Sequence, residues 1–152
     1  MHAATALTPS KLDFPRPSGL SVQPSATERL RLAAAELFRQ GRLAEADALI
    51  HDALQQHPDS EDVLVMRALI SEVLHDWSSA AAALEHLVQL QGRSAPAEVW
   101  CHWVRVLRCQ GRSQRAGEVA AQALTWHPLH PALSAELMAL GQPVISEERR
   151  AA

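Results

Sequence analysis

The chain has 152 residues, enough for one domain or a short array of repeats with a buried core. Hydrophobic residues make up 47% of it and charged residues 20%, as in ordinary soluble globular proteins, and the net charge of -3 argues against a dedicated nucleic-acid binder. Only one of the 14 basic residues, Lys11, is a lysine. Together with the abundant alanine, this bias indicates a GC-rich genome, which favours a bacterial source.

The two cysteines and the hydropathy pattern indicate a cytoplasmic location. If Cys101 and Cys109 share one helix, they lie about 12 Å apart along its axis, which exceeds the separation of about 7 Å that a disulfide tolerates. Reduced thiols are typical of a reducing compartment. No stretch approaches the roughly 20 apolar residues of a membrane span, and the first residues lack the pattern of a secretory signal.

Residues 1–24 are interpreted as a disordered arm, because four prolines disfavour a helix there: Pro9, Pro15, Pro17 and Pro24. Leu12, Phe14 and Leu20 would still allow this arm to dock on the domain or on a partner. Order is expected from Ser25, which forms a capping box with Glu28 at the start of a helix.

Seven helices are predicted from residue 25 onward. The first runs to Gly41 with Leu30, Ala33, Ala34, Leu37 and Phe38 on one side, and the second spans about 43–56. The third, 63–74, is apolar nearly all round, which is typical of a helix buried between neighbours. The others are expected at about 77–90, from a Ser94 cap to Gly111, and at 113–126 and 131–140.

An internal repeat organises these helices. Gly41, Ala46, Ala53 and Pro58 return at a constant spacing as Gly111, Ala116, Ala123 and Pro128. Pairs of helices recurring at about 34 residues resemble the tetratricopeptide repeat (TPR) family. The resemblance implies an all-α, TPR-like α-solenoid with a domain at 25–141, repeats at about 27–60, 61–94 and 97–130, a capping helix at 131–141 and a tail at 142–152.

The middle repeat departs from the family pattern. His75 replaces the turn glycine, Gly92 replaces the closing proline, and Arg67 and Ser71 occupy positions that are usually apolar. Shifting its first helix by one residue would instead turn Val63, Met66 and Ile70 inward, so the sequence leaves the register open.

The resemblance also implies a concave groove, lined by the first helix of each pair, that takes an extended peptide or a partner helix. The positions that match are Arg31, Ala35, Phe38, Val65, Leu69, Glu72, Arg105 and Arg108, with Glu28, Asp62 and Glu98 at the ends. This groove is apolar in its middle, which favours an amphipathic or extended apolar partner. Some members of the family hold the C-terminal carboxylate of heat-shock proteins with lysine and asparagine side chains on these helices. Ala35, Met66 and Leu69 offer no such amide, which argues against that ligand here.

The charge pattern adds two hypotheses. Arg105, Arg108, Arg112 and Arg115 lie within eleven residues, either as a site for an acidic peptide or as a solvated helix end favoured by the helix dipole. Residues 27–94 carry eleven acids against six arginines, so the array is acidic first and basic last. That asymmetry would orient a partner or favour a homo-oligomer formed head to tail.

No motif for catalysis is present, and the chain is not expected to be an enzyme. The eight histidines suggest no metal site, because those beside prolines lie at helix ends, and no cofactor is implied. Trp100 and Trp103 fall on core positions, whereas Trp77 and Trp126 are candidates for partner contacts. We expect a protein-binding module similar in layout to bacterial type III secretion chaperones; a general assembly adaptor or scaffold and, as a different class, a small metal-binding enzyme are the alternatives.

Overall fold

The computed structural model describes residues 25–141, which form seven α-helices and one short 3-10 turn. The helices are α2 (Ala26–Arg39), α3 (Leu43–Gln56), α4 (Glu61–Val73), α5 (Trp77–Gln91), α6 (Ala97–Cys109), α7 (Ser113–Trp126) and α8 (Pro131–Ala139), and η1 (Gly92–Ser94) follows α5. The sequence-predicted arm 1–24 and tail 142–152 lie outside the described residues. None of the helices in the described part is long and apolar enough to cross a membrane.

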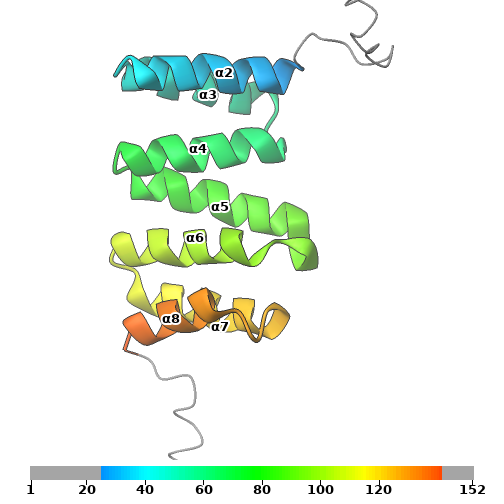
Figure 1. Cartoon of the computed structure of the whole chain (residues 1–152), viewed down its shortest axis with the longest axis vertical. Coiled ribbons are helices and arrows are strands. Elements are labelled where there is room, and N and C mark those ends of the chain that lie inside the picture. Colours follow the sequence, from blue (N-terminus) through cyan, green and yellow to red (C-terminus); the bar gives the residue numbers. More distant parts are fainter. Residues whose placement is uncertain (1–24, 142–152) are drawn as a thin grey trace, which may run out of the picture.

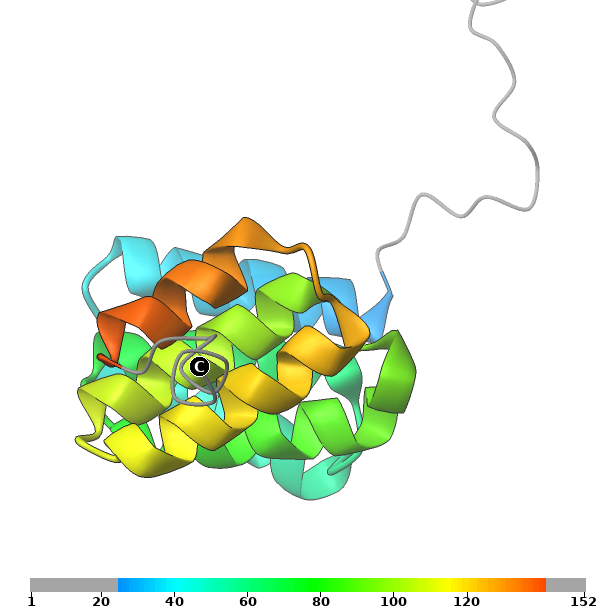
Figure 2. The same ribbon diagram turned by 90° about the horizontal axis from the view of Figure 1, so that it is seen from below.

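The helices pair into three antiparallel hairpins that stack along the long axis of the molecule (Figure 1). They are α2–α3, α4–α5 and α6–α7, and each packs mainly on its neighbours in sequence. Helix α8 contacts both helices of the last hairpin, as a capping helix should. Seen from below the stack, α2 and α8 lie on one side of the molecule and α5 and α7 on the other (Figure 2). The predicted all-α solenoid is therefore confirmed.

The same backbone conformation closes the turn of every hairpin. Gly41 and Gly111 have φ of 75° and 82°, in the left-handed region that glycine adopts without steric penalty. His75 occupies the matching place in the second hairpin with φ of 61°, although it carries a side chain. Its ring stacks on Trp77 with a centroid separation of 5.4 Å, so the strained residue is fixed by a contact at the start of α5.

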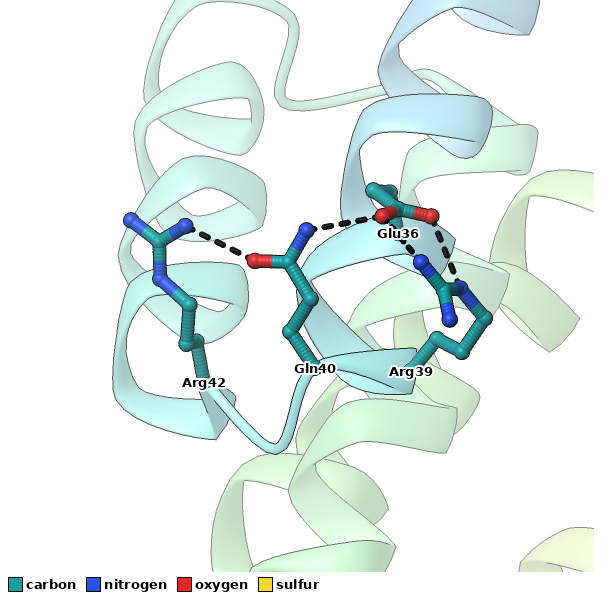
Figure 3. A network of polar contacts seen from close by, with 4 residues as sticks. All are labelled: Glu36, Arg39, Gln40 and Arg42. Carbon is teal, nitrogen blue, oxygen red and sulfur yellow. Dashed lines mark hydrogen bonds and ion pairs between the residues drawn. The ribbon is translucent and has the colours of Figure 1, made fainter.

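A chain of polar side chains spans the first of these turns (Figure 3). The carboxylate of Glu36 accepts hydrogen bonds from Arg39 at 2.6 Å and from the side-chain amide nitrogen of Gln40 at 2.7 Å, and Arg42 donates to the side-chain oxygen of Gln40 at 2.8 Å. The bonds from Arg39, and then from Gln40, hold the pKa of the Glu36 carboxyl below its usual range. These groups are exposed, so they define the turn more than they stabilise the domain.

Small residues allow close packing within each hairpin. Ala46, Ala80 and Ala116 occupy equivalent positions on α3, α5 and α7, and all three are completely buried. Larger side chains fill the space between hairpins, including Leu84, Leu87, Leu107 and Val119. The core divides into a smaller cluster around the first hairpin and α4 and a larger one from α4 to α8.

The middle hairpin keeps the register of the other two. Leu64, Ala68 and Ser71 are buried at the positions that the repeat assigns to the inner face of α4. Val63 and Ile70 are buried as well, against the first hairpin. The two alternatives left open by the sequence are thus two sides of one helix, which packs on both of its neighbours.

Ser71 is the one buried polar side chain among the described residues, at 1% exposure, and its hydroxyl has no hydrogen-bond partner. Changing Ser71 to alanine should raise the free energy of unfolding by about 1 kcal/mol, because the buried hydroxyl is removed and little volume is lost. Urea denaturation followed by circular dichroism measures the effect. Ser78→Ala is the control, since Ser78 accepts a hydrogen bond from Gln110 at 3.1 Å. A loss of stability from Ser71→Ala would contradict the prediction.

Two expectations about the helices are wrong, and the apolar side of α2 is only partly buried. Ser94 does not cap the fifth helix, because its hydroxyl donates to the Gln91 carbonyl within η1 and α6 begins at Ala97 after an extended Pro96. Of the five apolar residues expected on one side of α2, Ala34 is buried and Leu30 and Leu37 are half-buried, whereas Ala33 and Phe38 are exposed, Phe38 at a position that the repeat assigns to the groove. Helix α4 is not buried all round, since its third face carries exposed apolar side chains. Of the Ser25–Glu28 capping box, the bond from the Glu28 amide to the Ser25 hydroxyl is present, at 3.1 Å.

Candidate partner-binding groove

A cavity of about 380 Å³ opens between α2 and α4, the first helices of the first two hairpins, and has α3 beneath it. Its walls carry Arg31, Ala35 and Phe38 from α2 and Met66, Leu69, Glu72 and Val73 from α4, and its base carries Ala34, Ala46, Ile50 and Ile70. We call this surface, together with Val65 one turn before Leu69, the α2–α4 groove.

Exposed apolar side chains follow the α4 side of the groove. Val65, Leu69 and Val73 are 40%, 51% and 45% exposed and stand four residues apart, so they form one stripe along the helix. Phe38 faces them from α2 with 42% of its surface exposed. A contiguous apolar strip of this kind is a usual mark of a surface that another molecule covers.

Charged groups lie beside this strip, where side chains of α4 and α6 contact each other. The Glu72 carboxylate contacts the His102 Nε2 at 2.9 Å and the Arg105 guanidinium at 3.6 Å, and both Glu72 and His102 are largely buried. On the opposite wall Arg31 is paired with Glu28 from the preceding turn. The hydrogen bond that Arg31 donates to the Glu28 carboxylate, and then the charge of that carboxylate, raise the pKa of Arg31 above its usual value. The apolar strip is therefore flanked by charges of both signs.

The structure gathers five of the eight sequence-predicted groove residues around one cavity: Arg31, Ala35, Phe38, Leu69 and Glu72. Val65 extends the apolar stripe, and Arg105 joins through its contact with Glu72. Arg108 is not gathered there, because it donates to Glu136 of the capping helix at 2.9 Å. The capping helix thus binds one of the basic groups that the sequence assigns to the groove.

The four arginines Arg105, Arg108, Arg112 and Arg115 do not gather into one site. Arg105 and Arg108 meet carboxylates on α4 and α8, and Arg115 pairs with Glu118 at 3.4 Å. These partners come from distant parts of the chain or from the next helical turn. Three of the four positive charges are therefore balanced within the protein.

Sequence reasoning missed two contributors. Val73 completes the stripe begun by Val65 and Leu69, and their regular spacing of four residues was a signal that could have identified it. His102 was not detectable, since only the packing of α6 against α4 brings its ring to Glu72, thirty residues earlier. Both cysteines lie on α6, half-buried Cys101 and exposed Cys109, and neither forms a disulfide. Burial, and then the carboxylates of Glu136 and Glu98, raise the pKa of the Cys101 thiol.

Within residues 25–141 no three histidine, cysteine, aspartate or glutamate side chains lie close enough together to hold a metal ion. Trp100 and Trp103 are buried as expected, at 2% and 5% exposure. Trp126 is 40% exposed and Trp77 is half-buried, which leaves Trp126 as the tryptophan most open to a partner.

Three stacked helical hairpins, a capping helix and a groove between first helices define a TPR-type α-solenoid. Solved structures share this fold, and the following two are examples. The first TPR of Spaghetti (RPAP3), bound to the HSP90 peptide SRMEEVD, is similar with a TM-score of 0.61 and 15% identity, covering 83% of this chain and 94% of that one. MamA (MSR-1, C2) is similar with a TM-score of 0.60 and 15% identity, covering 89% of this chain and 84% of that one. No protein-family model and no curated protein matches the sequence.

Proposed function

We propose that the chain is a non-catalytic protein-interaction module that binds an apolar segment of a partner in the α2–α4 groove. The observation that carries the proposal is the exposed apolar strip: Phe38, Leu69 and Val73 line the cavity, and Val65 extends the strip by one turn of α4. Burying these side chains is favourable at roughly 25 cal/mol per Å² of apolar surface removed from water. A similar fold that holds a peptide supports the same class of ligand here.

The chemistry of the groove favours an amphipathic helix or an extended apolar strand as the bound segment. Apolar partner side chains would contact the stripe on α4, while Arg31 and Glu72 on opposite walls meet polar groups at its edges. An acidic C-terminal peptide fits less well, because Ala35, Met66 and Leu69 present no amide to a carboxylate.

The finer proposal is a bacterial, cytoplasmic chaperone that keeps a type III secretion substrate soluble before export. A small three-hairpin chain with one apolar groove suits such a role, since a substrate held before export would expose the apolar segments that the groove covers. A general assembly adaptor or scaffold would bind its partner through the same groove. The chaperone and the adaptor are distinguished by whether the partner is soluble without this chain.

The test compares the intact chain with a variant that carries Val65→Glu and Leu69→Glu. Partners recovered from cells of the source organism are identified with the intact chain, then purified and titrated by calorimetry. Two carboxylates in an apolar contact should weaken binding at least about tenfold, which corresponds to roughly 1.4 kcal/mol. A partner that is soluble only when co-expressed with the chain supports the chaperone, and one that is stable alone supports the adaptor.

The matched control carries Leu90→Glu and Leu129→Glu, which place the same charges on exposed leucines outside the groove. This control should bind as the intact chain does. Equal affinity of all three proteins for the partner would show that the α2–α4 groove is not the binding site.

A further inference from the structure

A second cavity, of about 340 Å³, lies between α5 and α7, the second helices of their hairpins, and shares no residue with the α2–α4 groove. Three of the four tryptophans line it, with two arginines from η1 and α7 and polar side chains from α5 and α7. The lining is Glu85, Val88, Gln89, Gly92, Arg93, Trp100, Trp103, Arg115, Gln122 and Trp126. We call it the Trp–Arg cavity.

Both arginines lie over tryptophan rings. The Arg93 Cζ is 4.8 Å from the centroid of Trp126, and the Arg115 Cζ is 5.5 Å from that of Trp103. A guanidinium stacked in this way is held in place, while the N–H groups at its edge can still donate to a carboxylate. Among the described residues no carboxylate pairs with Arg93, and Arg115 has only the 3.4 Å contact with exposed Glu118.

Trp100 provides an independent sign of an absent partner. It lines the cavity, is 2% exposed, and its indole nitrogen has no hydrogen-bond acceptor among the described groups. A buried indole N–H usually has a partner, and leaving one without an acceptor is unfavourable. The lining of the cavity therefore includes one tryptophan with an unpaired indole donor and one arginine without a carboxylate partner, Arg93.

At the equivalent place one repeat earlier, the arginine is paired with other side chains of the same protein. A cavity of about 430 Å³ between α3 and α5 is lined by Arg67 and Ser79, which stand 36 residues before Trp103 and Arg115. There Arg67 donates to Asp47 at 2.6 Å and to Ser79 at 3.3 Å. In the earlier cavity, the arginine is therefore paired with a carboxylate of the same chain. In the Trp–Arg cavity, Trp103 and Arg115 stand at the positions of Arg67 and Ser79, and no such pair forms between them.

We propose that the Trp–Arg cavity is a second binding site, which takes an acidic segment of a partner protein. A glutamate or aspartate carboxylate of the segment is held by the guanidinium edges of Arg93 and Arg115, and the apolar side chain next to it packs against Trp103 and Trp126. Glu85 lines the same cavity, so the site favours one carboxylate and disfavours a dense run of acids. This proposal does not depend on the function of the α2–α4 groove.

The probe is the peptide acetyl-Leu-Glu-Leu-Glu-amide, titrated into the full chain while the four tryptophan indole N–H signals are followed by NMR. The signals of Trp100, Trp103 and Trp126 should shift. Trp77 should not, since it lies at the far end of α5 from Gly92, about 22 Å along the helix. The neutral peptide acetyl-Leu-Gln-Leu-Gln-amide should bind at least tenfold more weakly, because the charge-assisted hydrogen bonds are lost.

Arg93→Gln should weaken binding of the glutamate peptide about tenfold. Arg112→Gln is the matched control: it removes the same charge beside α7 but does not line this cavity, and it should leave the affinity unchanged. Circular dichroism verifies that both variants fold. Equal shifts with the two peptides, a shift of Trp77 as large as the others, or equal losses in the two variants would each overturn the proposal.

Discussion

Replacing Leu107 by alanine should lower the free energy of unfolding by about 3 kcal/mol, the largest stability change that we expect from a single substitution in this chain. Leu107 is 1% exposed near the end of α6, within the cluster that joins the last two hairpins and the capping helix. Removing its branched end loses apolar burial and leaves a space that fixed helices on three sides cannot fill.

Urea denaturation followed by circular dichroism measures the change, and Leu90→Ala serves as the control. Leu90 is 39% exposed on α5, so its truncation should cost under about 0.5 kcal/mol. If the two substitutions cost the same, Leu107 does not have the packing described for it. Each repeat contacts only its neighbours in the stack. The stability lost in Leu107→Ala should therefore make the C-terminal hairpin unfold at a lower urea concentration than the other hairpins.

Enlarging Ala116 to leucine is the second large effect, with an expected loss of about 2 to 3 kcal/mol. Ala116 is fully buried on α7 against α6, at the place that Ala46 and Ala80 occupy in the other hairpins. Three additional carbon atoms cannot enter this contact unless the two helices move apart, and the moved helix would disturb the packing of α8 as well.

The control is Ala121→Leu, an exposed position on the same helix, where the substitution should change stability by less than about 0.5 kcal/mol. Thermal unfolding of both variants gives the comparison. A stable Ala116→Leu protein with an unchanged midpoint would mean that the hairpin has room for the larger side chain, contrary to its complete burial.

The fold was predictable because its landmarks are local. Glycines at the turns, prolines after the second helices and alanines at Ala46 and Ala116 recur at one spacing, and each has a steric cause that acts wherever it occurs. The turn at His75 was predictable only from its position in the repeat, which requires the left-handed backbone conformation there. Histidine itself does not favour that conformation as glycine does.

The candidate site was less predictable, because its chemistry depends on contacts between hairpins. The first-helix positions Phe38, Val65 and Leu69 followed from the repeat pattern; Phe38 and Leu69 line one cavity, and Val65 is exposed one turn before Leu69. The fate of Arg108 did not follow, since its partner Glu136 lies on the capping helix. Likewise, the apolar character of α4 predicted burial, whereas a first helix packs on two sides and leaves its third side open.

Helix α2 buries only Ala34 and stands at the end of the stack, yet it forms one complete wall of the α2–α4 groove. Helices with so little buried surface are the first to open in local fluctuations of a solenoid. A ligand that bridges α2 and α4 would therefore do more than occupy a rigid slot: its binding free energy would also hold the terminal hairpin closed. Recognition and the order of the first hairpin become one coupled equilibrium, in which a bound partner slows amide exchange throughout α2.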